Sequence, residues 1–430
     1  MKYIPLHIPL FRLFITLFIS CLLCYAPTMS ALHTQNTPDS IAPTDSISQA
    51  DTIPPPPLDV PAKVGIIIRD LSSGEDIVER NPDMPLSPAS ITKCLTAACC
   101  MLDGKEDMCF TTSAYIEGAI RDRQLYGNLV IMASGDPTTE SRHFPSNKAL
   151  HDSIAAHVSN LGIDSIRGQI IFDSSIVPES GPSTHWMTED FKWSYGAGHY
   201  AINFRDNTVG ADRAMPDPPG NFYDALCEAL ESRGVFILDE EIDIAGKPTL
   251  IYSRRSPKGS EIMRSMMVRS DNMFAEGMLR SLSPGGNTEE AVTREKKLLA
   301  SSGLNLSTPM AIYDGSGLAR DNRLTPRFMS DLLAMMAKSP YARNYIKLFP
   351  AAGEEGTVRR LLKDTPLAGR LVLKSGSMRG VQCYAGYKLD EHGAPSHVVV
   401  IMVNGFSCPR KEVVASAEQM LLDTFIAKDK

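Results

Sequence analysis

The sequence predicts an α+β fold in which a smaller α/β domain is inserted into a larger domain. Three observations support this prediction. A strand hairpin pattern at residues 64–79 leads straight into a helix that is apolar on nearly every face. Between about residues 108 and 250 the pattern changes to short strands and amphipathic helices. From Pro257 onward helix patterns dominate, and three strand patterns and a last helix end the chain.

Length and composition limit the classes of protein to consider. With 430 residues, of which 43% are hydrophobic, the chain can form two or three domains with a substantial core. Its net charge of −7 gives no indication of nucleic-acid binding. The nine cysteines do not form two C-x-x-C pairs at zinc-site spacing, so we expect no metal site and no cofactor.

Residues 1–31 are predicted to be a signal peptide. Lys2 and Arg12 supply positive charge, residues 13–24 are almost entirely apolar, and small residues follow. The apolar run is short for a membrane span. We therefore expect export to the periplasm, with membrane contact only through this segment or by weak association. The residues before Cys21 form a poor lipidation box, so a lipoprotein anchor is the less favoured alternative.

Residues 32–60 are predicted to be a disordered linker, because they are rich in Thr, Ser, Pro and Asp and contain a run of prolines. The larger domain is then expected at residues 61–107 and 255–430, and the inserted domain at residues 108–254. If the signal peptide is removed, seven cysteines remain. An odd number leaves at least one thiol without an intramolecular partner.

The order of elements follows from apolar periodicity and turn residues. Strands are predicted at residues 64–70, 76–79, 129–132 and 169–172, with helices at 151–161 and 221–233. Later helices are predicted at residues 261–269, 273–281, 288–301 and 326–337. The chain then continues with strands at residues 370–374, 382–389 and 397–404 and a helix at 411–426.

Ser90 and Lys93 form an S-x-x-K motif at the start of the first helix. Ser87 is expected to cap that helix and Pro88 to occupy its first turn. Lys93, one turn after Ser90, then lies beside the serine hydroxyl. The helix that follows is buried, and desolvation lowers the pKa of a lysine, so Lys93 is a candidate general base for a nucleophilic serine. A capped helix with one solvated lysine explains the same residues.

Two further motifs and a glycine-rich loop contain candidate site residues. Ser270-Asp271-Asn272 lies between two helices, where a helix cap is the alternative explanation. Lys374-Ser375-Gly376-Ser377 ends a strand, where a turn is the alternative. Asp314-Gly315-Ser316-Gly317-Leu318 lacks the lysine and the following helix of a phosphate loop, so we do not expect nucleotide binding.

The order S-x-x-K, S-x-N, K-[ST]-G resembles that of penicillin-binding proteins and serine β-lactamases. The surrounding residues resemble, more narrowly, the D-alanyl-D-alanine carboxypeptidase/endopeptidase family of class C low-molecular-mass penicillin-binding proteins, peptidase family S13. The resemblance extends from about residue 60 to the end. It is carried by Pro88-Ala89-Ser90, Ser270-Asp271-Asn272-Met273, residues 314–320 and residues 374–381. The 180 residues between Ser90 and Ser270 also fit this family, whereas class A β-lactamases have no such insertion.

The resemblance implies a penicillin-binding-protein/serine β-lactamase-like domain. Its core is a five-stranded antiparallel sheet with helices on both sides, in which the first hairpin pairs beside the last strands. Fuller members of the family carry a second insertion nested in the first. Only residues 209–220 are available for it here, so we expect the nested domain to be missing or reduced to a loop.

The resemblance also assigns roles to the first two motifs. Ser90 would be the nucleophile that attacks the carbonyl between two D-alanines, and Lys93 the base that takes its proton. Ser270 would hydrogen-bond Lys93 and relay a proton to the leaving amine. Asn272 would hold the substrate amide and the Lys93 amine.

Substrate binding is implied for the third motif. Lys374 would attract the terminal carboxylate, helped by the hydroxyl of Ser375, where the family usually has threonine. Gly376 completes the motif. The backbone N–H groups of Ser90 and Ser377 would form the oxyanion hole, and the substrate would lie along this strand edge.

Specificity is implied for the inserted domain. The family places an aspartate four residues after a tryptophan to bind the free amine of a diamino-acid side chain, and Trp186 and Asp190 match that spacing. Tyr195, Arg320 and Met378 fall at other family positions that line the same pocket. A helix cap or surface charge is the alternative for Asp190, and ordinary packing is the alternative for Tyr195 and Met378.

The expected function is a periplasmic serine D-Ala-D-Ala carboxypeptidase, DD-endopeptidase, or both. Its partners would be peptidoglycan stem peptides, with β-lactams as covalent inhibitors of Ser90. A β-lactamase or esterase on the same scaffold is one alternative, and a non-catalytic wall-binding or β-lactam-sensing protein is another. The presence of every motif residue argues against the last.

Overall fold

The computed structural model describes residues 62–426 except 146–148, 245 and 308. The chain divides into two units, residues 1–50 and 51–430, and every described residue belongs to the second. The predicted signal peptide and linker therefore lie outside the described residues. Among the described helices, none combines the length and the apolar character needed to cross a membrane.

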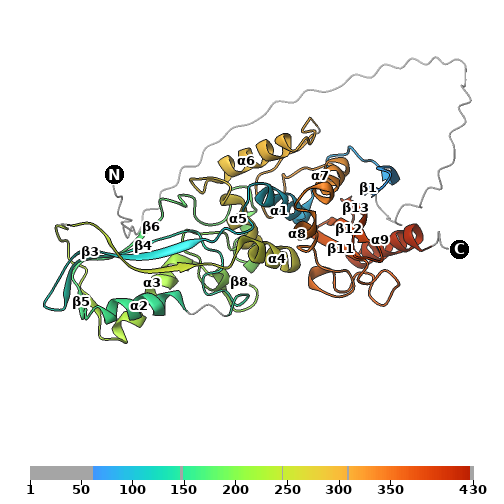
Figure 1. Ribbon diagram of the computed structural model, residues 1–430. Coiled ribbons are helices and arrows are strands. Elements are labelled where there is room, and N and C mark those ends of the chain that lie inside the picture. The colour runs from blue at the N-terminus through green and yellow to red at the C-terminus, as the bar shows by residue number, and fades with distance from the viewer. Residues whose placement is uncertain (1–61, 146–148, 245, 308, 427–430) are drawn as a thin grey trace, which may run out of the picture. The chain divides into compact units, whose positions relative to one another are not determined.

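A five-stranded antiparallel sheet joins the two ends of the described chain. Its strand order is β11-β12-β13-β1-β2. Strand β1 pairs along its whole length with β13, from Lys63 opposite Asn404 to Asp70 opposite His397. Figure 1 shows the blue and red ends of the chain side by side here. The sheet implied by the resemblance is confirmed, with strands β1 (Lys63–Asp70), β2 (Asp76–Arg80), β11 (Leu371–Met378), β12 (Val381–Leu389) and β13 (Pro395–Asn404).

Both faces of this sheet are covered, which explains why its central strands are apolar without alternation. Successive side chains of a strand point to opposite faces. Val398, Val400 and Met402 belong to a core shared with the helices around α1, whereas Val399 and Ile401 belong to a second core shared with α9. The covering helices are α1 (Thr92–Leu102), α4 (Gly259–Arg269), α5 (Asn272–Arg280), α6 (Thr288–Ser301), α7 (Pro326–Lys338), α8 (Ala342–Ile346) and α9 (Arg410–Phe425).

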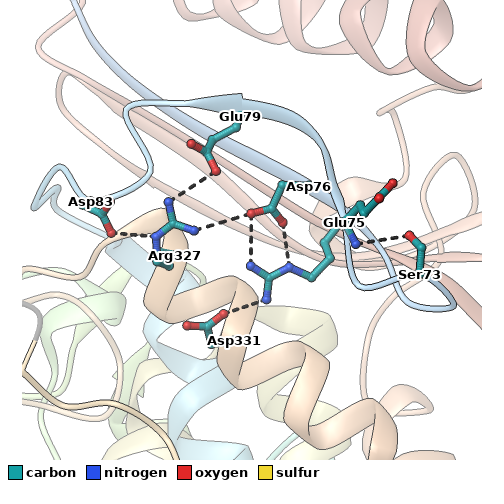
Figure 2. A network of polar contacts seen from close by, with 8 residues as sticks. Ser73, Glu75, Asp76, Glu79, Asp83, Arg327 and Asp331 are labelled. Carbon is teal, nitrogen blue, oxygen red and sulfur yellow. Dashed lines mark hydrogen bonds and ion pairs between the residues drawn. The ribbon is translucent and has the colours of Figure 1, made fainter. Parts of the chain in front are cut away.

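An ion-pair network holds the first hairpin against helix α7 (Figure 2). Arg327, near the start of α7, donates to Asp83 over 2.8 Å and lies 3.5 Å from Asp76. Arg69 of β1 pairs with Asp76 and with Asp331 of α7, each over 2.6 Å. Asp76 is therefore shared by two arginines, and its side chain is only 15% exposed.

A second sheet lies in the segment expected as the insertion. Its strands run in the order β10-β3-β4-β5-β9, and β6 pairs beside β4. A separate apolar core joins this sheet to helices α2 and α3. The elements are β3 (Thr111–Arg121), β4 (Gln124–Met132), α2 (Leu150–Asn160), β5 (Ser165–Ile166), β6 (Ile170–Asp173), α3 (Pro218–Glu231), β9 (Phe236–Ile237) and β10 (Thr249–Arg255).

A small hairpin lies where fuller family members are expected to carry the nested domain. Strands β7 (Thr208–Val209) and β8 (Arg213–Ala214) pair with each other, and α3 begins four residues later. Asp217 caps α3 by accepting a hydrogen bond from the Gly220 N–H, and prolines occupy its first turn.

Candidate active site

Ser90 lies in a short 3-10 turn, η1 (Ala89–Ile91), just before α1. The expected N-cap at Ser87 is wrong. Its hydroxyl has no hydrogen-bond partner among the described residues. Its backbone N–H and carbonyl bond instead to the Asn404 side chain, at 2.7 and 3.1 Å. The reason is tertiary, because the end of β13 holds this segment in place before the helix can begin.

The backbone around Ser90 is packed tightly against two glycines. Ala89 has a φ of 47°, and Gly317 lies so close to its carbonyl that a side chain at 317 would collide. On the other side, a Cβ on Gly376 would lie 2.9 Å from the Ser90 backbone nitrogen. The two backbone N–H groups expected to bind an oxyanion, those of Ser90 and Ser377, therefore lie on segments in direct contact.

The Lys93 amine is enclosed by three oxygen atoms. Its Nζ lies 3.0 Å from Ser90 Oγ, 2.7 Å from Asn272 Oδ1 and 2.7 Å from the Ser316 carbonyl oxygen. A neutral amine has two N–H donors and one lone pair. Those groups match the two acceptor oxygens and the serine hydroxyl. Lys93 is fully buried, and burial lowers its pKa to about 8, although the charges of nearby carboxylates oppose that shift.

The second motif joins α4 to α5. Ser270 ends α4 in a left-handed conformation, with φ 61°, and Asp271 caps α5 through the Phe274 N–H. The helix cap considered from sequence is therefore Asp271. The Asn272 amide nitrogen donates to the Tyr195 carbonyl over 2.7 Å, while its oxygen accepts from Lys93.

Ser270 pairs with Lys374 rather than with Lys93. Lys374 Nζ donates to Ser270 Oγ over 2.8 Å and to the Ser375 carbonyl over 2.6 Å. Lys374 is fully buried, and burial together with the positive charge of Lys93 lowers its pKa well below the usual range. The Ser375 hydroxyl donates to Thr357 Oγ1 over 2.7 Å. Thr357 is a neighbour of the third motif that sequence reasoning missed.

The glycine-rich loop at residues 314–318 positions the carbonyl that holds Lys93. Asp314 is fully buried and accepts the N–H groups of Gly317 and Ala319 at 2.9 and 2.7 Å. Glu276 accepts the Ser316 N–H at 2.9 Å. Sequence reasoning excluded nucleotide binding but did not find this supporting role. The sequence Asp314-Gly315-Ser316-Gly317 could have indicated a tight loop in which the aspartate accepts hydrogen bonds from the following backbone N–H groups.

The segment expected to be an insertion contributes Asp190 and Tyr195 to the same region. Tyr195 Oη donates to Asp190 Oδ1 over 3.0 Å, and Tyr195 is 46% exposed. Trp186 is buried and donates its Nε1–H to Asp314 over 2.8 Å, which ties this segment to the loop that supports Lys93.

Arg320 and Met378, the other two residues expected in the substrate pocket, line one pocket of about 360 Å³. The positive charge of Arg320 also acts on Tyr195, where it opposes the raised pKa of the phenol that burial causes. The structure therefore brings the predicted residues together in two groups. One surrounds Lys93 and Lys374, and the other lines the pocket that contains Arg320 and Met378. Within the described part of the chain, no cluster of three His, Cys, Asp or Glu side chains could hold a metal ion.

Comparisons with known proteins show which family this chain resembles. The D-alanyl-D-alanine carboxypeptidase of an Actinomadura species is 25% identical, in an alignment that covers 82% of this chain and 80% of the relative. The structure of penicillin binding protein 4 (dacB) from Haemophilus influenzae matches with a TM-score of 0.74 at 20% identity, covering 86% of this chain and 97% of that one.

A predatory peptidoglycan endopeptidase from Bdellovibrio bacteriovorus also shares the fold. Its TM-score is 0.54 at 16% identity, covering 86% of this chain and 94% of that one. The model of the D-Ala-D-Ala carboxypeptidase 3 (S13) family matches residues 53–212 and 201–428, which is most of the sequence. The chain therefore belongs to the D-Ala-D-Ala carboxypeptidase 3 (S13) family.

Proposed function

We propose that this protein removes the terminal D-alanine from peptidoglycan stem peptides, cleaves the cross-links between them, or does both, through an acyl-enzyme on Ser90. Membership of the family makes the protein a serine-type hydrolase of D-Ala-D-Ala peptides. The observation that carries the proposed mechanism is the 3.0 Å contact between Ser90 Oγ and a buried Lys93 amine. A base and a nucleophile within hydrogen-bond reach are what acyl transfer requires.

The first step is attack of Ser90 on the carbonyl between two D-alanines. Lys93, in its neutral form, takes the hydroxyl proton, while Asn272 and the Ser316 carbonyl keep its amine in place. The negative charge that develops on the carbonyl oxygen is stabilised by the backbone N–H groups of Ser90 and Ser377.

The second step is departure of the amine. Ser270 is placed to donate its hydroxyl proton to the leaving nitrogen. Lys374, which donates a hydrogen bond to Ser270 Oγ over 2.8 Å, then supplies a new proton to that hydroxyl. Lys374 also attracts the terminal carboxylate, and a bound carboxylate restores the charged form that burial disfavours. Water then attacks the ester carbonyl and gives one proton to the Ser270–Lys374 pair, while the protonated Lys93 returns its proton to the departing Ser90 oxygen. A β-lactam would acylate Ser90 by the same route.

Recognition of the stem peptide falls to the pair Asp190 and Tyr195. The Asp190 carboxylate holds the Tyr195 hydroxyl and has further acceptor capacity for an ammonium group. We therefore assign to it the free amine of a diamino-acid side chain. We also assign residues 108–254 to an inserted domain, because the second sheet and its apolar core fall between residues 111 and 255.

Export is part of this proposal. The substrate lies in the cell wall, and the apolar run at residues 13–24 suits a cleaved signal peptide. The mature protein would act in the periplasm. Labelling of intact cells with a membrane-impermeant reagent tests this, and protein found only in the cytoplasmic fraction would contradict it.

The test is digestion of purified muropeptides, with Ser90→Ala as the control. Release of D-alanine supports carboxypeptidase activity, and conversion of cross-linked dimers to monomers supports endopeptidase activity. A folded protein that yields neither product would overturn the proposal. Rapid, continuous turnover of nitrocefin in place of a stable acyl-enzyme would favour a β-lactamase instead.

A further inference from the structure

A groove of about 780 Å³ runs along helix α4 and is lined by none of the residues assigned above to the reaction. Its lining includes the buried side chains of Met101, Met263 and Leu348 and the half-buried side chains of Phe144 and Val268. Helix α4 has 11 residues, so the groove is about 16 Å long. That length accommodates about five residues of an extended peptide.

One end of the groove adjoins the residues that handle the leaving group. Val268 lies two residues before Ser270, which is placed to protonate the leaving amine. A Cβ on Gly356 would collide with the Val268 carbonyl, so these two segments are in direct contact. The next residue, Thr357, accepts a hydrogen bond from Ser375 over 2.7 Å. The groove therefore ends beside the second and third motifs, on the side of the site from which the leaving group departs.

The opposite wall of the groove also contacts the helix of the second motif. The rings of His143 and Phe144 lie 6.1 and 5.8 Å from the ring of Phe274, two residues after Asn272. Burial lowers the pKa of His143, and the positive charge of Arg269 adds to that shift. Arg269, at the end of α4, therefore lies close enough to this wall for its charge to act across the groove.

Two cations in the groove are available to a ligand. Arg269 and Lys347 are exposed, and neither side chain has an ion pair or a hydrogen bond within the described ranges. The other charged side chains of the lining are engaged: Lys258 pairs with Asp107, Arg264 pairs with Glu355, Glu106 accepts from Asn344, and Glu261 accepts from the Lys258 N–H. The charges that remain are both positive, so the groove is complementary to a chain with carboxylates.

The two reactions of the proposed function differ in the size of the leaving group. A carboxypeptidase releases a single D-alanine, which extends no further than Lys374. An endopeptidase releases the amine of a second stem peptide, which is a longer chain with free carboxylates. That chain has to continue past Ser270 and Lys374, where the groove begins. Asp190 and Tyr195, which are assigned to the acyl side, do not line the groove.

We propose that the groove along α4 holds the leaving stem peptide of a cross-linked substrate, with Arg269 and Lys347 binding its carboxylates. The inference rests on the proposed function and makes cross-linked peptides a substrate class of this protein. It also predicts that the groove acts on the cleavage of cross-links and has no part in the release of D-alanine.

The experiment compares a purified cross-linked muropeptide dimer with an uncross-linked pentapeptide that ends in D-Ala-D-Ala. The test variant combines Arg269→Gln and Lys347→Gln. A matched control combines Arg343→Gln and Lys297→Gln, which also remove one arginine and one lysine, both exposed and outside the groove. Circular dichroism establishes that both variants are folded.

In the test variant KM for the dimer should rise about fivefold relative to the control, because each exposed ion pair contributes about two- to threefold. The kcat for the dimer should change little, and KM for the pentapeptide should match that of the control. An unchanged KM for the dimer, or an equal rise in KM for both substrates, would overturn the groove assignment.

Two outcomes separate this inference from the proposed function. A wild type that releases D-alanine from the pentapeptide but does not cleave the dimer would overturn the groove assignment and leave the proposed function standing. If the wild type cleaves neither substrate, isothermal titration of the dimer into Ser90→Ala, with and without Arg269→Gln and Lys347→Gln, requires no turnover. Weaker dimer binding with the two substitutions would support the groove, and equal affinities would overturn it.

Discussion

The rate at which a β-lactam acylates Ser90 should rise with pH around a midpoint of about 8. Lys93 acts as base only when its amine is neutral, and burial lowers its pKa to about 8. An exposed lysine, with a pKa of about 10.4, would remain charged throughout this range. At pH 7 about one tenth of the molecules hold the neutral amine, and at pH 9 about nine tenths do. The second-order rate constant should therefore increase roughly tenfold between these values.

Stopped-flow measurement with a fluorescent penicillin from pH 6 to pH 10 provides the assay. Removal of a general base costs about 10²–10⁴-fold, so Lys93→Met should be slower by that factor and should lack the rise near pH 8. Lys297→Gln removes an exposed lysine and should keep the wild-type profile. A rate that is flat between pH 7 and pH 9, or a midpoint near 10.4, would refute the argument.

Three further predictions concern buried or shared carboxylates. Glu276→Gln removes a negative charge that raises the pKa of Lys93, so the acylation midpoint should move to lower pH in the same assay, and an unchanged midpoint would contradict this. Burial raises the pKa of Glu295 to about 8. Between about pH 5 and 8 the folded state then holds a proton that the unfolded state has lost, and stability falls as the pH rises. Glu295→Gln should therefore raise the melting temperature more at pH 9 than at pH 5, and equal shifts would argue against the linkage. Asp76→Asn weakens the ion pairs with Arg69 and Arg327, so urea unfolding should show that the free energy of unfolding falls by about 1–3 kcal/mol. A loss below about 0.5 kcal/mol would mean that the network contributes little.

Several elements followed from local sequence alone. Strand β13 is buried on both faces, so its apolar residues form a continuous run and do not alternate with polar ones. The length of the run and its β-branched residues still predicted a strand. Helix α6 begins and ends where its pattern predicted, because Asn287 caps it through the Glu290 N–H. Strand β3 was missed. Gly118 and the charged residues near its end interrupt the alternation, and only pairing with β4 and β10 makes it a strand.

The contact between the Ser90 hydroxyl and the Lys93 amine follows from their spacing of three residues at the start of a helix, so the local sequence was enough to predict it. It also determined the order of the three motifs. What the tertiary structure decided is which groups surround that amine. Asn272 and Ser316 come from 179 and 223 residues further along the chain, and Ser270 turns to Lys374 instead. Desolvation and long-range hydrogen bonds depend on how distant segments pack, and no local pattern of residues encodes them.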